Sequence, residues 1–456
     1  MMNFRYSVYG RIRVRLTGVL HIGGEPEDDA VTEKDAAALA RDGEGRYIIP
    51  ASGLAGVVRH FLEERESETG EQQNDVDRML AFFGGSEAGE NRIYFYDGIC
   101  ENVMLERRAG SRMDHAMGTA QEGGLHAKVC LAPGMTTVLP LQFFAEDEEK
   151  RETAVKLIQE IAGALDSGRI KLGAGTANGA GTFRVQKISY RSLDLQDRHD
   201  LDRYLEGLDD LLTGQGEGWK ELTWEKVPEP DQFILTVDAP EGILVKNYSQ
   251  TDIADAVNVS FCIADDADTL HYYIPGTSFK GVLRTGAEKI WSTLHLPAED
   301  LEQIFGSAPD SQNNRQKSHI YVRDTEIPEP TPYIYNRIRV NRWLGGVMTG
   351  AKMNEQIIYP SEKHPMSFCA AVAERLPDRL AKEAEAVLFL LLRDIGTGRL
   401  TLGSGSSIGL GRCRGIRLQW NGRMMEFRNG CISCDESTEK ELQGLLASLQ
   451  SQEESV

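Results

Sequence analysis

The sequence has little that would place it in a membrane or outside the cell. Its 456 residues contain no run of about 18 apolar residues, so no membrane-spanning helix and no membrane partner are expected. The opening MMNFRYSVYGRIRVRL lacks the apolar core of a signal peptide, which predicts a cytoplasmic protein. Cysteine is scarce, and an odd, scattered set of seven residues suits a reducing cytoplasm. Only Cys431 and Cys434 form a CxxC, and no second pair accompanies it, so zinc is not indicated.

Positive charge is also in deficit. Lysine and arginine number 50 against 70 aspartates and glutamates, giving a net charge of −20. A general attraction to nucleic acid is therefore not expected, although binding needs only a local basic stripe. The acidic residues concentrate in 192–230 and after Cys434. The charge balance leaves RNA binding open.

Glycine, by contrast, is concentrated in one loop that occurs twice. Residues 172–184 read LGAGTANGAGTFR and residues 402–414 read LGSGSSIGLGRCR, at an offset of 230 residues. Three residues separate Gly405 from Gly409, so the spacing does not fit the dinucleotide pattern G-x-G-x-x-G. A repeat at half the chain length predicts a duplicated domain. The glycines in register are Gly173, Gly175, Gly179 and Gly181 with Gly403, Gly405, Gly409 and Gly411.

Other landmarks recur in the same order. IIPASGLAGVVR (48–59) matches YIPGTSFKGVLR (273–284), and each has the pattern of a strand end, a turn and a helix start. RIYFYDG (92–98) parallels HIYVRDT (319–325), and both are typical of a short strand that ends at an aspartate. The repeat therefore extends over most of the chain.

Each glycine loop follows a segment with apolar residues at helical spacing, 149–166 and 380–395. The order of elements predicts an α+β fold of two tandem ferredoxin-like (β-α-β-β-α-β) domains with inserted β-hairpins. The expected organisation is a first domain, an acidic linker, a second domain and an acidic tail, at residues 1–188, 189–229, 230–435 and 436–456.

At IPGTSFKGVLR followed by LGSGSSIGLGR, the sequence resembles the RAMP superfamily. More narrowly, it is similar to the backbone subunits of type III CRISPR effector complexes, and the tandem arrangement resembles the III-D branch. The resemblance implies a role in antiviral defence, with guide RNA, target RNA and other subunits of the complex as partners. It covers nearly the whole chain outside the linker and the tail.

In the family, the glycine loops and neighbouring cations lie against guide RNA. Glycine lets backbone N–H groups approach a phosphate closely, because no Cβ intervenes. The alternative is that the glycines only form tight turns. The RNA-binding residues that the resemblance implies are Arg59, Gly173, Gly175, Gly179, Gly181 and Arg184 in the first half, and Lys280, Arg284, Gly403, Gly405, Gly409, Gly411 and Arg412 in the second.

The resemblance also implies metal-dependent cleavage of target RNA by a loop aspartate that holds Mg²⁺ or Mn²⁺. Asp35 precedes Pro50 by fifteen residues, and Asp255 precedes Pro275 by twenty. A single hard oxygen ligand suits an ion that keeps most of its waters. The alternatives for this position are Asp28, Asp29 and Asp252.

Segments 105–130 and 333–356 resemble the hairpin that in the family wedges into the guide–target duplex. Unstacked bases favour apolar and aromatic partners, and arginines hold phosphates without reading sequence. The expected wedge residues are Met113, Met117, Val340, Trp343 and Met348, and the expected phosphate ligands are Arg112, Arg337, Arg339 and Arg342.

Three other functions stay open at this point. The chain could bind RNA in the same complex without cutting it. It could process precursor guide RNA without a metal through a histidine, for which His21, His115 and His126 are the candidates. It could also be a duplicated scaffold that does not bind RNA.

Overall fold

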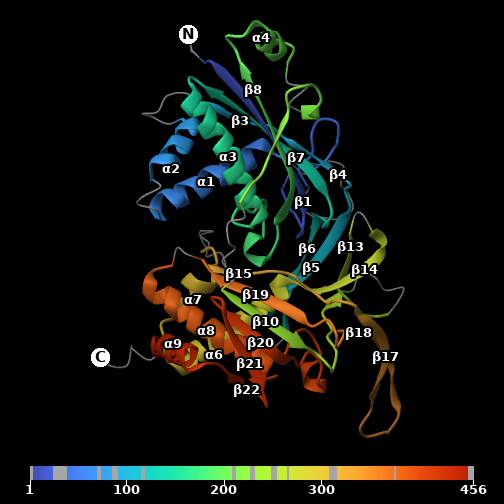
Figure 1. Cartoon of the computed structure of the whole chain (residues 1–456). Coiled ribbons are helices and arrows are strands. Elements are labelled where there is room, and N and C mark those ends of the chain that lie inside the picture. Colours follow the sequence, from blue (N-terminus) through green and yellow to red (C-terminus); the bar gives the residue numbers. More distant parts are fainter. Residues whose placement is uncertain are drawn as a thin grey trace.

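The protein forms two α+β halves, which lie one above the other in Figure 1, with the first half from blue to green and the second from yellow to red. The expected α+β fold is confirmed. The computed structural model describes residues 4–23, 39–68, 73–84, 91–114, 119–207, 212–225, 232–247, 254–263, 266–307, 316–373 and 376–449.

The first half is built on an antiparallel sheet with the order β2-β4-β7-β1-β8-β9, in which β3 also pairs with β7. Its strands are β1 (Tyr6–Leu16), β2 (Ile48–Ile49), β3 (Ile93–Phe95), β4 (Gly98–Glu101), β7 (Thr136–Ala145), β8 (Phe183–Asp194) and β9 (Lys220–Leu222). Its helices are α1 (Ala51–Glu68), α2 (Gln73–Leu80), α3 (Glu148–Asp166) and α4 (Arg198–Leu205).

The second half repeats this plan with the order β15-β19-β10-β20-β21-β22. The strands of this sheet are β10 (Phe233–Asp238), β15 (Ile320–Val322), β19 (Met366–Val372), β20 (Arg414–Trp420), β21 (Arg423–Arg428) and β22 (Cys431–Ser433). Its helices are α6 (Gly276–Thr293), α7 (Ala298–Phe305), α8 (Asp378–Gly396) and α9 (Glu436–Ala447). In both halves the core therefore follows the chain order strand, helix, strand, strand, helix, strand.

Helices α3 and α8 occupy the segments in which helical spacing was seen, and each covers one face of its sheet. Their buried residues, such as Leu157, Ile161 and Leu165 in α3, recur at three- and four-residue intervals. Strand β1 passes so close beneath α3 that a Cβ at Gly10 would lie 2.7 Å from the Cδ1 of Ile158. Burial of each such aliphatic side chain contributes about 1.5–3 kcal/mol.

Each half carries an inserted hairpin at the expected place. The first hairpin is β5 (Leu105–Asp114) with β6 (Thr119–Leu131), and the second is β17 (Thr331–Val340) with β18 (Val347–Tyr359). The smaller elements are η1 (Ala81–Phe83), η2 (Thr176–Asn178), η3 (Ser406–Ile408), β11 (Lys246–Asn247), β12 (Val257–Asn258), β13 (Ser260–Ile263), β14 (Asp266–Ile274) and β16 (Thr325–Glu326).

The segments expected to be linker and tail contribute to the two halves. The boundary expected at residue 188 falls inside β8, and β9 pairs with β8 as an edge strand. In the expected tail, Leu442, Leu445 and Leu449 are buried in the core of the second half. The acidic residues belong to the exposed faces of these segments, whereas a few apolar residues decide where the segments pack against the two halves.

The two glycine loops have the same backbone. All eight glycines have a positive φ, between 73° and 96°. A Cβ at Gly181 would lie 1.9 Å from the carbonyl oxygen of Leu172, and one at Gly411 would lie 1.9 Å from that of Leu402. Glycine is thus required by the fold of the loop itself.

The first glycine loop packs against the second half, where η2 contacts α6 and β15. A Cβ at Gly179 would lie 2.8 Å from the Cα of Arg323. A Cβ at Gly276 would lie 2.4 Å from the carbonyl oxygen of Asn178. The loop backbone therefore touches the turn before α6 directly, without room for a side chain at either glycine.

A buried ionic cluster reinforces this contact. Arg108 of the first hairpin pairs with Asp324 at 2.7 Å and with Glu106 at 2.9 Å, and the Tyr273 hydroxyl donates to Glu106 at 2.7 Å. Burial by itself lowers the pKa of the Arg108 guanidinium, but Asp324, Tyr273 and Glu106 outweigh this and raise it above its ordinary value. Burial also raises the pKa of Tyr273 well above its usual range. The cluster joins the two halves through fixed charges.

Candidate nucleic-acid interface

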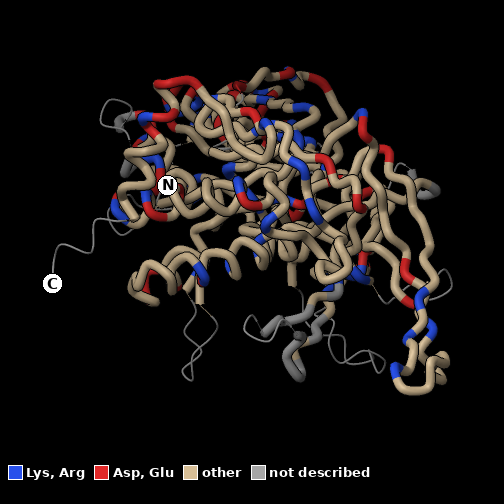
Figure 2. The backbone as a smooth tube through the Cα atoms, turned by 90° about the horizontal axis from the view of Figure 1, so that it is seen from below, with Lys and Arg blue, Asp and Glu red and all other residues tan. Residues whose placement is uncertain are grey.

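The second hairpin projects away from the body of the protein, at the lower right of Figure 1. Its strands pair from Thr331↔Tyr359 to Val340↔Val347, and nearly all of β17 is exposed. Lysine and arginine gather toward its free end, and acidic residues lie nearer the body, as Figure 2 shows. The hairpin combines apolar and cationic side chains on a surface that the rest of the chain leaves uncovered.

The tip of this hairpin is apolar, exposed and conformationally defined. Trp343 is 96% exposed and Leu344 is 83% exposed. The Asn341 side chain accepts hydrogen bonds from the N–H groups of both residues, at 2.9 and 3.1 Å. Large apolar side chains held in solvent are typical of a surface that binds a partner.

Two of the three phosphate ligands expected on this hairpin are available to a ligand, and the third, Arg337, is engaged by a carboxylate. Arg339 and Arg342 are exposed, and neither forms an ion pair with a residue that the structure describes. Arg337 instead pairs with Glu355 at 3.2 Å, and Lys246 meets the same carboxylate at 2.7 Å. The cations toward the tip are therefore free of carboxylates, whereas those at the base neutralise a buried glutamate.

Asp255 lies at the base of the same hairpin. Its Oδ2 accepts a hydrogen bond from the backbone N–H of Asn354 in β18 at 2.6 Å, and the residue is exposed. The neighbouring Ala256 bridges Glu355, so the backbone fixes Asp255 beside β18. One carboxylate oxygen is thus anchored, and Oδ1 makes no hydrogen bond or ion pair within the described parts of the chain.

Several other candidates lie outside the described residues, namely Asp28, Asp29, Asp35, His115, Met117 and Asp252, together with the side chains of Arg112, Met113 and His126. His21 is described and buried, and its Nδ1 lies 2.8 Å from the carbonyl oxygen of Val129. That contact holds the loop after β1 against β6, which is a structural role.

The remaining predicted cations differ in availability. Arg59 and Arg184 are exposed at the surface, paired with Glu63 at 2.9 Å and with Asp166 at 3.7 Å. Arg412, in the second glycine loop, is exposed and has no ion pair among the residues described.

Lys280 and Arg284 are held within the second half. The Lys280 Nζ donates to the carbonyl oxygen of Ile320 at 2.7 Å, and Arg284 donates to that of Gly306 at 3.0 Å. Burial, with a smaller contribution from Arg284, lowers the pKa of Lys280 to about 7. The motif predicted both cations as RNA ligands, but the structure gives them internal partners.

The glycine loops also use backbone N–H groups internally. Gly181 donates to the carbonyl oxygen of Val19 at 2.7 Å, and Gly411 donates to that of Gly242 at 2.9 Å. These bonds tie each loop to the segment that follows the first strand of its half. The alternative, that the glycines of these loops form tight turns, therefore explains part of their number.

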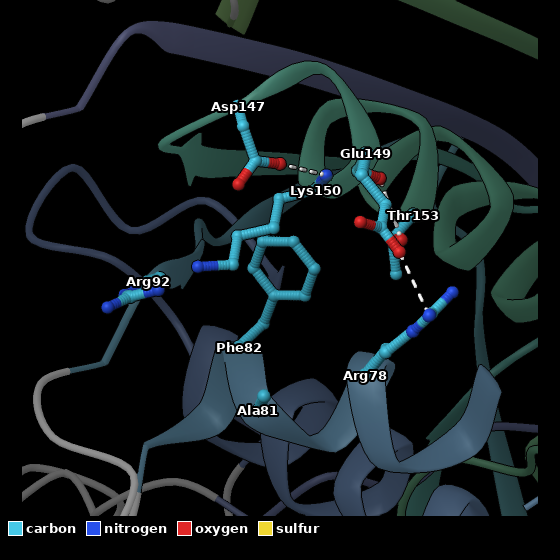
Figure 3. Close-up of a pocket in the computed structure, with 8 residues that line it drawn as sticks. All are labelled: Arg78, Ala81, Phe82, Arg92, Asp147, Glu149, Lys150 and Thr153. Carbon is cyan, nitrogen blue, oxygen red and sulfur yellow. Dashed lines mark hydrogen bonds and ion pairs between the residues drawn. The ribbon is translucent and has the colours of Figure 1, made fainter. Parts of the chain in front are cut away.

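A pocket of about 320 Å³ lies between α2 and α3 of the first half. Figure 3 shows that its charged side chains come in opposite signs, with Arg78 directed at Glu149. That pair is separated by 2.9 Å, and Arg92 is likewise paired with Glu146 at 2.7 Å. Because both arginines are already paired with carboxylates, neither is free to bind an anionic ligand in the pocket.

Sequence reasoning missed part of this interface. Leu344 at the tip, Lys246 and Glu355 at the base, and the exposed Tyr333 were not singled out. The alternation of large apolar and cationic residues in TPYIYNRIRV was the available signal. In the described parts of the chain, no group of three or more His, Cys, Asp or Glu side chains could hold a metal, and no helix is long and apolar enough to cross a membrane.

The model of the RAMP superfamily matches residues 14–184 and 208–414. These two regions cover most of the chain, so the protein belongs to the RAMP superfamily, with one family region in each half. The chain is also similar to a chain in the cryo-EM structure of the type III-B Cmr-beta complex bound to cognate target RNA, at 17% identity and a TM-score of 0.30. That likeness covers 41% of this chain and 61% of the solved chain. No curated protein matches the sequence.

Proposed function

We propose that this RAMP protein is a tandem backbone subunit of a type III CRISPR effector complex. In this role it binds guide RNA, holds the duplex with target RNA and serves antiviral defence. The observation that carries the proposal is the exposed second hairpin, with Trp343 and Leu344 at its tip and Arg339 and Arg342 beside them. Family membership in both halves supports it.

The hairpin has the chemistry to bind RNA without reading its sequence. An indole stacks on any base, and each stacking contact contributes about 1–3 kcal/mol. Exposed arginines add phosphate contacts, which are independent of sequence and weaken with salt. Sequence recognition then depends on pairing between guide and target, as in other RNA-guided systems.

We further propose that the chain cleaves target RNA at two sites. Asp255 is the catalytic residue of one site, and Asp35 in the first half is that of the other. The donor set fits a hydrated magnesium ion, because the backbone N–H of Asn354 anchors Oδ2 and leaves Oδ1 as one hard oxygen ligand. A bound Mg²⁺ would stabilise charge that develops on the phosphate. Asp255 would hold the ion beside the hairpin, and Arg337 and Lys246 neutralise Glu355 nearby.

The same hydrogen bond favours a second function, in which Asp255 only fixes the base of the hairpin and the subunit binds RNA without cutting it. Asparagine distinguishes the two, because an amide oxygen can accept the Asn354 N–H but carries no charge for a metal. Asp255→Ala removes both properties.

The test is cleavage of labelled target RNA by the assembled complex, with Mg²⁺ and with EDTA. If Asp255 holds the metal, Asp255→Asn and Asp255→Ala both slow one cleavage by roughly 100-fold or more. Asp35→Ala is expected to remove a different product. Wild-type cleavage by Asp255→Asn would contradict the catalytic role and support the structural one. Cleavage that persists in EDTA would point to a metal-independent reaction.

RNA binding is tested separately, by fluorescence anisotropy of the full chain with a guide–target duplex across a salt series. Trp343→Ala is expected to weaken binding by roughly 5- to 100-fold at any sequence. Arg342→Ala is expected to reduce the slope of log affinity against log salt by about one. Arg428→Ala, on β21 and paired with Glu426, is the matched control. Equal binding by all variants would contradict the proposed interface.

A further inference from the structure

The sheet of the first half carries a row of cations on the face that α3 does not cover. In β1, three arginines alternate with apolar residues that are buried toward α3, so the arginines share the opposite face. Two further cations extend from the neighbouring strand β8. The cationic face consists of Arg11, Arg13, Arg15, Arg184 and Lys187. At one end it is closed by Trp219, whose ring lies 5.8 Å from the guanidinium carbon of Arg11.

The cations of this face lie opposite one another. Strands β1 and β8 pair so that Arg13 faces Lys187 and Arg15 faces Arg184. Like charges directly opposite each other in an antiparallel pair destabilise a sheet. Burial lowers the pKa of Arg11, and the charge of Arg13 lowers it further, whereas Glu101 acts in the opposite direction. Positive charge is therefore crowded on this face at a cost to the folded chain.

The second half builds the same strand pair without this crowding. Strands β10 and β20 shift register at the equivalent point, so Arg15 corresponds to Asp238, which lies opposite Arg414. Arg417 lies opposite Thr236 and donates to its hydroxyl at 3.3 Å. Each cation there faces an acid or a hydroxyl. The fold thus does not require opposed cations, and their presence in the first half indicates a ligand.

The ion pairs of the cationic face leave its cations accessible. Three of them pair with carboxylates, namely Arg13 with Glu101, Lys187 with Glu221 and Arg184 with Asp166. The side chains of these three cations are 43–56% exposed. Exposed ion pairs are weak, so a phosphate group can replace the carboxylate. The face as a whole is a basic stripe on an acidic protein.

The form of the stripe suits an extended chain of phosphates. Successive outward side chains of a strand are about 6.6–6.8 Å apart, a spacing that an extended single strand of nucleic acid can match with its phosphates. Arginine also presents a planar fork that fits a phosphate group. The adjoining outward residues Thr136, Val138 and Ser189 are small, so the face lacks the large apolar anchors of a protein interface.

We propose that the cationic face binds the sugar–phosphate backbone of a single-stranded nucleic acid. Phosphate contacts carry no sequence information, and telling RNA from DNA depends on contacts to the 2′-hydroxyl. A site made of cations alone therefore binds RNA and DNA strands alike. The inference goes beyond the proposed function, because it concerns an unpaired strand on the first half and not the guide–target duplex at the second hairpin.

The test is fluorescence anisotropy of the full chain with labelled oligouridylate and oligothymidylate of about 12 nucleotides, across a salt series. The charge variant is Arg13→Gln/Arg15→Gln/Lys187→Gln. Its affinity for both oligonucleotides is expected to fall by roughly 10-fold or more, and the slope of log affinity against log salt by about 2, at about 0.7 for each phosphate contact. Wild type is expected to bind the two oligonucleotides within about threefold of each other.

The matched control removes the same charge from the second sheet. Arg417→Gln/Arg423→Gln/Arg428→Gln is expected to stay within about threefold of wild type, because salt screens distant charges. Circular dichroism and thermal midpoints check that both variants are folded. The charge variant is expected to lose no stability, since it relieves the opposed cations.

Four results would overturn the proposal. Equal affinities of the charge variant and the control would show that the face does not bind the strand. Binding of oligouridylate more than roughly 10-fold tighter than oligothymidylate would show that the site reads the 2′-hydroxyl. Loss of single-strand binding in Trp343→Ala, with the charge variant unaffected, would place the strand on the hairpin. Self-association of wild type in sedimentation velocity that the charge variant abolishes would identify an acidic surface of a second copy as the occupant. Duplex binding at the hairpin is measured separately, so failure of one proposal is distinguishable from failure of the other.

Discussion

The two glycine loops have nearly the same backbone but opposite surroundings. The first is covered by the second half, with Gly179 buried against Arg323. The second is open at Ile408 and Gly409. The hairpins differ in parallel, because Arg108 of the first is buried in an ionic cluster, whereas Arg339 and Arg342 of the second are exposed. Of the two copies, one thus joins the two halves of the chain, and the other is exposed to solvent.

The largest effect is expected at Arg108. Arg108→Met leaves the buried Glu106 and the partly buried Asp324 without a counter-charge, which costs about 3–5 kcal/mol of unfolding free energy. Urea unfolding measures it. Arg59→Met, which breaks the exposed pair with Glu63, is the control and should cost about 0–1 kcal/mol. Equal losses in the two variants would show that the cluster does not stabilise the contact.

A smaller effect, with an unusual sign, is expected at Gly276. Alanine near a helix start ordinarily stabilises by about 0.4–1 kcal/mol when the backbone permits it. Gly276 does not have a left-handed φ, yet its Cβ would clash with Asn178, so Gly276→Ala is expected to destabilise by about 1–3 kcal/mol. The thermal midpoint of Gly276→Ala is compared with that of Ala51→Gly, which makes the reverse change at the equivalent turn of the first half. A stabilised Gly276→Ala protein would contradict the close contact.

The smallest effect is a pH dependence of the unfolding free energy that comes from Lys280 in the second half. The equivalent residue in the first half is Ala55, which does not titrate. Since the folded pKa of Lys280 is lowered to about 7, the unfolded chain binds a proton between pH 7 and 10.5 that the folded chain lacks. Stability therefore rises with pH across this window.

We expect a gain of about 1–2 kcal/mol from pH 7 to pH 9, measured by urea unfolding, and expect Lys280→Met to remove it. The range ends at pH 9 because burial raises the pKa of Cys100 and Cys413 to about 12, which has the opposite effect at higher pH. An unchanged slope in Lys280→Met would assign the effect to other groups.

Much of the fold was predictable because it depends on local patterns. The helical spacing in 149–166 predicted α3 within one residue of its bounds, Glu148–Asp166. The landmark RIYFYDG predicted β3, and its final aspartate caps the turn before α1. Of the candidate site, Trp343, Arg339 and Arg342 were predicted and lie exposed on the hairpin. Asp255 was also predicted, and its position beside β18 comes from the structure.

The sequence by itself determined the duplication, the glycine loops and the order of elements. Apolar periodicity acts over a few residues, and the positive φ of a tight turn admits little besides glycine. Only the tertiary structure decided which copy is covered, because burial depends on how two distant surfaces meet. It buried Lys280, which the motif presents as a free cation, and it added β9 to the first sheet from a segment that reads as an acidic linker. It also gave Gly179 and Gly409 opposite surroundings although their loops have the same backbone.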